Sequence, residues 1–279
     1  MGWLIYCKVF PHLNKNIISL LILSGTTLAI TGLLQLIFMP DLRFLQQLGW
    51  DPHYFRTAST FFDPNFLGAY MVLTLLLIYN KISKSNLLYN LAAILIFLAL
   101  LTTFSRGAYL AFVSAFLTLA ILKKSIRLGS TTIFLFFILI LGFQIYQQLV
   151  AQPRNINRTE SAEERLTTWQ QGLQIFTMNP VLGIGFNSYR YALAQNSFGD
   201  SQFLQSHGAS TNDSSLLYVS ATTGILGLIS YLFFLLSLVL TKKRNLILIA
   251  ALVGLLAQSF FANTLFYPPI LLWIILMAI

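Results

Sequence analysis

Residues 152–212 read QPRNINRTESAEERLTTWQQGLQIFTMNPVLGIGFNSYRYALAQNSFGDSQFLQSHGASTN, and they form the one long polar segment in a chain of apolar blocks. Extended back to Val150, this segment (residues 150–212) carries charges of both signs and a histidine. The ionisable residues are Arg154, Arg158, Glu160, Glu163, Glu164, Arg165, Arg190, Asp200 and His207. If the protein does chemistry, we expect the reacting groups to come from this segment and from the helix ends that face it.

The composition around this segment is that of a membrane protein. Hydrophobic residues make up 57% of the chain and charged residues only 9%, whereas a soluble domain carries about 25% charged residues. Apolar blocks that can cross about 30 Å of hydrocarbon as helices recur along the whole length. Because the blocks lack the alternation of membrane β-strands, the sequence predicts an all-α integral membrane protein, a polytopic bundle of about seven or eight spans.

The net charge of +9 is distributed unevenly. All eight lysines, with Arg127 and Arg244, fall in short connectors on one side of the predicted bundle, where no acid lies. The eight acids and the other seven arginines fall on the opposite side. Since cations collect on the cytoplasmic side of membrane proteins, we expect a cytoplasmic N-terminus and an extracytoplasmic segment 150–212. The same asymmetry sets aside nucleic acid as a partner and leaves membrane lipids.

The apolar blocks place the expected spans in order. They cover residues 16–39, 66–80, 87–104, 107–122, 130–149, 213–240 and 246–261, and an eighth begins at residue 268. Pro64 suits the first turn of the second span, with Asp63 as its N-cap. We interpret residues 1–279 as a single polytopic membrane domain that contains the large loop 150–212.

Span 213–240 is long for a single crossing. Either its first turns project above the membrane, or the chain kinks near Gly224 and Gly227.

Two short helices are expected inside the large loop. Residues 162–177 place Leu166, Trp169, Leu173 and Phe176 on one face, the spacing of an amphipathic helix that lies on a membrane surface. Asn179 and Pro180 end this helix, and the glycines of VLGIGFNSY predict a tight bend. A second helix is expected over residues 188–195.

Arg106 is the sharpest single signal, because it lies in LLTTFSRGAYLAF between two apolar blocks with almost no connector. A guanidinium at a membrane boundary is costly without a partner, which favours a functional role. The alternative is an interfacial anchor whose charged end reaches the lipid phosphates.

Arg56 and Arg165 are weaker candidates when each is taken alone. Arg165 begins the amphipathic helix and can simply pair with Glu160 or Glu163, and Arg56 can be an ordinary loop charge. However, every cation on the predicted outer side is Arg, and the charge rule for topology does not explain that choice. The planar guanidinium suits bidentate binding of phosphate, so we expect Arg56, Arg106 and Arg165 to bind an anion.

His207 and Asp213 are the candidate bases. His207 lies just before span 213–240, where a lone histidine is usually solvated, but beside arginines it can accept a proton from a reacting hydroxyl. Asp213 can cap the following helix, or it can orient a hydroxyl or the histidine.

Several motifs that would bring in a metal or a cofactor are absent. The sequence has no Asp-x-Asp pair for Mg²⁺, no phosphate-binding Gly-x-x-x-x-Gly-Lys loop, no His-Glu-x-x-His zinc helix and no Gly-x-Ser-x-Gly elbow. We therefore expect no metal site and no cofactor.

Four stretches, in this order, resemble the O-antigen ligase and O-antigen polymerase family of bacterial envelope glycan enzymes. They are RTASTFFDPNFLGAYM, TTFSRGAYLAF, ERLTTWQQGLQIFTMNPVLGIGFNSY and NDSSLLYVSATTGILGLISYL. The resemblance covers residues from about 56 to 240.

This resemblance implies a multi-pass protein of the bacterial cytoplasmic membrane. Its reaction would move a glycan from an undecaprenyl-diphosphate carrier to a hydroxyl of a glycan or lipid acceptor on the outer side, without metal. Arg106 and Arg165 match the two arginines that hold the diphosphate, with Arg56 as an auxiliary cation. The family histidine often directly precedes an asparagine, where this chain has Thr211, so His207 is the candidate for its role. Members usually carry more spans than are counted here, which implies further helices.

Two other functions fit the residues. The first is a transporter or flippase of an anionic lipid-linked or small solute, for which an intramembrane arginine and a glycine-interrupted span are suitable. The second is a scaffold without catalysis, for which the clustered arginines have no evident use.

Overall fold

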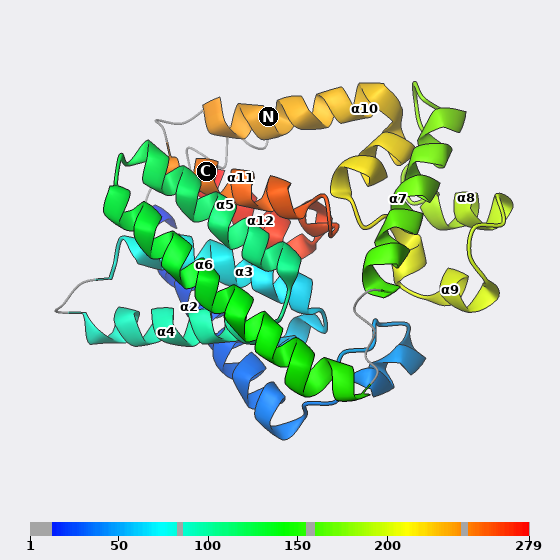
Figure 1. Cartoon of the computed structure of the whole chain (residues 1–279). Helices are drawn as coiled ribbons and strands as arrows, with labels where there is room; N and C mark the ends of the chain where they lie inside the picture. Colours follow the sequence, from blue (N-terminus) through cyan, green and yellow to red (C-terminus); the bar gives the residue numbers. More distant parts are fainter. Residues whose placement is uncertain (1–12, 83–85, 155–159, 241–244, 279) are drawn as a thin grey trace.

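The computed structural model describes residues 13–82, 86–154, 160–240 and 245–278, and these residues are mostly helical (Figure 1). The helices are α2 (Leu13–Phe38), α3 (Pro64–Tyr79), α4 (Leu87–Thr102), α5 (Arg106–Leu122), α6 (Ile126–Tyr146), α7 (Glu160–Met178), α8 (Tyr189–Gln195), α9 (Ser201–Gln205), α10 (Ser215–Leu240), α11 (Leu246–Gln258) and α12 (Pro268–Ala278). The described residues contain no β-strand, only an isolated bridge between Asp41 and Tyr54. The all-α prediction is confirmed for them.

In the part of the chain that the structure describes, three helical segments are long and apolar enough to cross a membrane. They are Ile17–Phe38, Ile126–Ala151 and Gly208–Leu240. Five shorter apolar helices, α3, α4, α5, α11 and α12, have 10–17 residues each. A 16-residue helix such as α3 rises about 24 Å, a little less than the hydrocarbon core. These apolar helices indicate an integral membrane protein.

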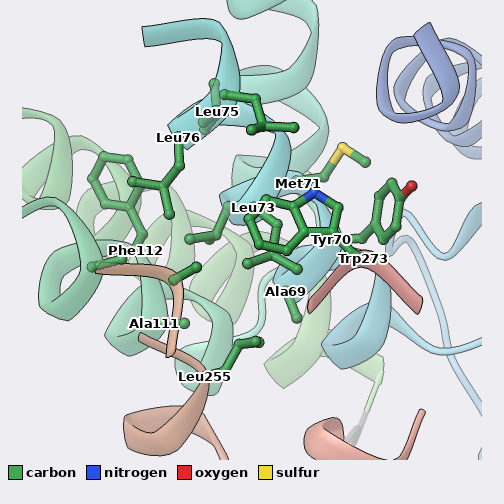
Figure 2. Close-up of a cluster of buried hydrophobic side chains, with 14 of the residues drawn as sticks. Ala69, Tyr70, Met71, Leu73, Leu75, Leu76, Ala111, Phe112, Leu255 and Trp273 are labelled. Carbon is green, nitrogen blue, oxygen red and sulfur yellow. The ribbon is translucent and has the colours of Figure 1, made fainter. Parts of the chain in front are cut away.

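Helix α3 lies at the centre of the bundle and packs against α2, α4, α5, α11 and α12. Its residues from Leu67 to Ile78 are all buried, as expected of a helix that is apolar all round. Figure 2 shows this core, in which Trp273 of α12 lies beside Tyr70 and Met71 of α3. The α3 sequence therefore fixes where the surrounding helices can pack.

Helices α5 and α11 approach each other closely through small residues. A Cβ atom on Gly254 would lie 2.7 Å from the carbonyl oxygen of Ala111 and 2.8 Å from the Cβ atom of Ala115. Small residues at helix contacts are typical of membrane bundles, where van der Waals packing drives association.

Helix α10 is kinked at Gly224, as one of the two alternatives for this span predicted. Gly224 has φ 65° and ψ −169°, a conformation that is essentially restricted to glycine. The kink leaves backbone groups of α10 without helical hydrogen bonds, and the loop after α7 forms hydrogen bonds with them. Ile184 and Gly185 donate their amides to the carbonyls of Ala221 and Thr222 (3.0 and 2.8 Å), and the Ile225 amide donates to the Pro180 carbonyl (2.8 Å).

Helix α7 forms where an amphipathic helix was expected, and the four residues of its predicted apolar face differ in their surroundings. Trp169 packs on Phe261, and Phe176 packs on the buried cluster that includes Tyr189. Thr168, Gly172 and Ile175 pack toward the start of α10, whereas Leu166 and Leu173 are exposed. The sequence pattern located the apolar residues of α7, but it did not locate the small and polar residues that bind α10.

The connectors divide into two ends of the bundle. The lysine end holds the turns after α3 and α5, with the described cations Lys81, Lys123, Lys124 and Arg127. The loop end, on the right in Figure 1, holds residues 39–63, 103–105, 147–154, 160–214 and 259–267. Lys8, Lys84, Lys242, Lys243 and Arg244 lie outside the described residues.

Candidate functional site

The helix ends at the loop end are joined by hydrogen bonds centred on Asn65, in the first turn of α3. Its side-chain oxygen accepts from Ser105 Oγ (2.7 Å), and its carbonyl accepts from Gln258 Nε2 (2.9 Å). Ser105 also caps α5 by accepting from the Ala108 amide. The starts of α3 and α5 and the end of α11 are therefore held in one place.

Asp63 caps α3 as the sequence predicted, with Pro64 at the first helical position. Its Oδ1 accepts from the amides of Asn65 and Phe66. Burial raises the pKa of Asp63, and these hydrogen bonds and the nearby arginine charges only partly oppose that shift.

Helix α7 is fixed to the start of α10 by a second group of hydrogen bonds. Asn212 is fully buried, and its amide donates to the Thr168 carbonyl and to the Tyr189 hydroxyl. Thr168 Oγ1 donates to Asp213 Oδ2 (3.0 Å). Asp213 is thus oriented by Thr168 of α7, which lies about one helical turn from Arg165.

A pocket of about 190 Å³ opens between these groups. Its walls come from four parts of the chain: residues 49–66, Arg165 on α7, residues 207–213 and residues 261–263. The charged side chains that line it are Asp51, Asp63, Asp213 and Arg165. No three His, Cys, Asp or Glu side chains among the described residues lie close enough together to hold a metal ion.

Arg56 lies in the loop of residues 39–63 and is buried, with 6% of its surface exposed. Its Nε donates to the Thr103 carbonyl (2.8 Å), and its Nη1 lies 3.4 Å from His53 Nδ1. Burial lowers the pKa of Arg56, while the charge of Asp63 partly offsets that effect. Arginine nevertheless stays protonated in proteins, so Arg56 is a fixed buried positive charge.

Arg106 occupies the first turn of α5 and is exposed. Its guanidinium lies 5.9 Å from the centroid of the Phe143 ring on α6, a cation–π contact. It makes no ion pair with any other described residue. Its charge is therefore held at the helix end without neutralisation by those residues.

Arg165 connects these groups electrostatically. Its positive charge repels the charges of Arg56 and Arg106. The same charge attracts the carboxylates of Asp63 and Asp213. Its side chain is half-buried and makes no ion pair with the described residues. Pairing with Glu160 or Glu163 was the alternative interpretation, but those side chains lie outside the part of the chain that the structure describes.

His207 reaches the pocket from the segment between α9 and α10. Its amide donates to the Gly49 carbonyl (3.0 Å), and its ring lies 4.9 Å from the Trp50 ring. Arg190 holds the preceding residue, because its Nη2 donates to the Ser206 carbonyl (2.7 Å). The large loop and the loop of residues 39–63 therefore meet at His207.

The candidate residues are thus partly brought together. Arg165, His207 and Asp213 line one pocket, and Arg56 and Arg106 lie outside its walls but within electrostatic reach of Arg165.

Sequence reasoning missed Trp50, Asn263 and Gln258, which also belong to this region. Gln258 had a usable signal, since an amide inside an apolar block is costly and often functional. Trp50 and Asn263 lie in loops, and nothing in the sequence pointed to their contacts.

The chain resembles a known protein family. A family model described as O-antigen ligase matches residues 91–232, a little over half of the chain, from α4 to α10. No curated protein matches the chain. The family consists of membrane enzymes of ligase or polymerase type that process envelope glycans. The chain therefore belongs to the O-antigen ligase family.

Proposed function

We propose that the protein transfers a glycan from an undecaprenyl-diphosphate carrier to a hydroxyl of a glycan or lipid acceptor, on the outer side of the bacterial cytoplasmic membrane. The observation that carries this proposal is the position of Arg165. It lines the pocket that also holds His207 and Asp213, at the same end of the bundle as Arg56 and Arg106.

The chemistry requires stabilisation of a leaving group. The acceptor oxygen forms a bond to the anomeric carbon of the donor sugar as the bond from that carbon to the diphosphate oxygen breaks. Undecaprenyl diphosphate leaves with the bonding electron pair, so negative charge develops on it. Fixed cations in a water-poor site stabilise such charge without reorganising. We assign this role to Arg106 and Arg165, with Arg56 as the auxiliary cation, so that arginines supply the charge a metal would otherwise provide.

A base must take the proton of the acceptor hydroxyl. His207 and Asp213 both line the pocket, and both side chains can accept a proton. Asp213 is oriented by Thr168, whereas His207 is positioned through Gly49 and Trp50. Parallel measurements on Asp213→Asn and His207→Ala identify the base as the residue whose replacement costs more activity.

The arrangement in the membrane follows from the same assignment. We propose that α2 to α6 and α10 to α12 cross the membrane as seven or eight spans of a single domain over residues 1–279. The lysine end then faces the cytoplasm, and the loop end, with segment 150–212, faces outward. The uneven placement of Lys and Arg supports this orientation.

Transport of an anionic lipid is the second candidate. It calls for a polar site near the middle of the membrane. Arg106 instead stands in the first turn of α5, and Arg165 lies on the helix beyond the spans. The cluster at the helix ends favours transfer over transport.

Replacement of Arg165 by alanine tests the proposal. In proteoliposomes with the lipid-linked glycan fraction from the source bacterium, Arg165→Ala should lower the release of undecaprenyl diphosphate by about 100-fold or more. The matched control is Arg127→Ala, an exposed arginine at the lysine end, which should keep full activity. Equal rates for both variants would rule out the assignment of Arg165. Movement of the glycan lipid across the bilayer without release of undecaprenyl diphosphate would indicate a flippase.

A further inference from the structure

The pocket has a charge pattern that does not suit a diphosphate. Asp51, Asp63 and Asp213 contribute three carboxyl groups to its walls, and Arg165 contributes the single guanidinium. Carboxylates repel a diphosphate at short range. They accept hydrogen bonds from hydroxyl groups readily. Arg106 and Arg56, which would attract a diphosphate, lie outside the walls. The pocket therefore favours a neutral ligand that is rich in hydroxyl groups.

One side of the pocket is aromatic. Trp50 lies 5.7 Å from the ring of Phe62 and 4.9 Å from the ring of His207, and all three residues line the pocket. A sugar ring has polar hydroxyl edges and faces made of C–H groups. Those faces pack against the electron-rich face of an aromatic ring. An aromatic wall beside carboxyl groups is thus complementary to both parts of a sugar ring.

Asn263 provides an independent indication of a ligand. It lines the pocket and is 9% exposed, yet its side-chain oxygen has no hydrogen-bond partner among the described residues. Buried polar groups without a partner are rare in native proteins because they are costly. This oxygen is itself covered, so a ligand hydroxyl satisfies it once the Asn263 side chain turns toward the pocket.

Size and position identify which sugar ring fits. The pocket volume of about 190 Å³ is below the range of about 300–1,000 Å³ for drug-sized ligands, so the pocket suits one ring rather than an oligosaccharide. Arg165 lines the pocket, and its charge also interacts with that of Arg106. A diphosphate held between Arg165 and Arg106 would place its directly attached sugar at the pocket.

We propose that the pocket walled by Trp50, Phe62 and Asn263 is a carbohydrate subsite that binds the sugar ring attached to the diphosphate of the lipid-linked donor. This inference rests on the proposed function and adds to it a set of residues that select the donor sugar. Trp50 is the stacking platform, and Asn263 accepts a hydrogen bond from a sugar hydroxyl.

The test compares two probes on the full-length protein in nanodiscs. One probe is bare undecaprenyl diphosphate, and the other is the lipid-linked glycan fraction extracted from the source bacterium. In the wild-type protein the glycan should tighten binding relative to the bare carrier. Trp50→Ala should reduce that gain by roughly five- to tenfold and leave the Kd of the bare carrier unchanged. Asn263→Ala should show the same pattern.

The control variant is Phe44→Ala, an exposed aromatic residue of the same loop that does not line the pocket. It should leave both Kd values unchanged. If the wild-type protein binds both probes equally, or if neither Trp50→Ala nor Asn263→Ala reduces the gain, the subsite is excluded while donor binding stands. If the wild-type protein binds neither probe, the proposed function itself fails. Unchanged binding of the bare carrier in the variants also shows that they are folded.

Discussion

The two ends of the bundle both carry cations, and they hold them in different ways. At the lysine end, Lys123 and Lys124 are exposed, and Lys123 donates to Asn80 Oδ1 (2.7 Å) while it lies 4.5 Å from the centroid of the Tyr79 ring. At the loop end, Arg56 is buried against a backbone carbonyl and Arg165 is half-buried beside a pocket.

This difference separates topology from function. A solvated lysine satisfies the rule that cations face the cytoplasm, and its surface contacts contribute little to stability. A buried or half-buried arginine must be supported by the fold around it. Among the described residues, the loop end alone contains such support, built from four separate parts of the chain. Replacing matched residues at the two ends therefore tests whether the fold supports the cations of the loop end more strongly than those of the lysine end.

The largest effect is expected from a matched pair of glycines. A Cβ atom at Gly224 would lie 2.2 Å from the Val181 carbonyl oxygen, in a conformation restricted to glycine, whereas a Cβ atom at Gly129 would meet only the Ala120 Cβ atom at 3.8 Å. Gly224→Ala should lower the free energy of unfolding by more than about 3 kcal/mol and abolish activity, because it separates the loop after α7 from α10. Gly129→Ala should be neutral or slightly stabilising.

Thermal unfolding in detergent and the release of undecaprenyl diphosphate measure the two consequences for this pair. Equal stability of the two alanine variants would show that the kink at Gly224 is not needed to hold the loop.

Arg56 and Lys123 form the second comparison. Arg56→Ala removes a buried charged donor and leaves the Thr103 carbonyl without it, which should cost about 2–3 kcal/mol of stability. Lys123→Ala removes exposed contacts only and should cost less than about 1 kcal/mol. Chemical denaturation of both variants in the same detergent measures the difference. A larger loss for Lys123→Ala would contradict the view that the loop end holds its cations more firmly.

Local sequence patterns were sufficient to predict the long helices and some of their ends, but not the short helix α9 in the large loop. Apolar runs located the helices that pack around α3, and the Asp63–Pro64 pair marked the start of that helix, as the structure bears out. Cap and turn preferences act within a few residues of the chain, so they can be read without knowing the fold. The kink at Gly224 was predicted as one of two alternatives, because the conformational preference of glycine is also local.

The contacts that build the site could not be predicted in this way. Trp50 meets His207, and Arg56 meets the Thr103 carbonyl, across long separations in sequence. Helical periodicity shows which residues share a face, but it does not show what the face contacts. The apolar face of α7 was therefore predicted from Leu166, Trp169, Leu173 and Phe176, whereas the hydrogen bond from Thr168 to Asp213 was not predicted.

The smallest effect expected concerns pH and compares two carboxyl groups of the loop end. Burial raises the pKa of Asp63, so the folded protein binds its proton more tightly than the unfolded chain does. The stabilisation from this group is full below the unfolded pKa of about 3.9 and is lost as the pH rises through the folded-state pKa. Asp63→Asn is neutral at every pH and keeps a side chain that can cap α3. It should therefore gain stability relative to the wild-type protein as the pH rises through that window.

Asp41 should behave in the opposite way, because the hydrogen bond from Arg43 lowers its pKa. Its stabilisation is present above the unfolded pKa and is lost as the pH falls through the folded-state pKa. Asp41→Asn should thus lose a little stability at neutral pH and approach the wild-type protein in acid. Unfolding temperatures of the three proteins, measured from acid to neutral pH, give two difference curves with slopes of opposite sign. Parallel curves would mean that Asp63 is solvated like a surface carboxylate, and the loop end would then lack the low-polarity surroundings that make its arginines effective.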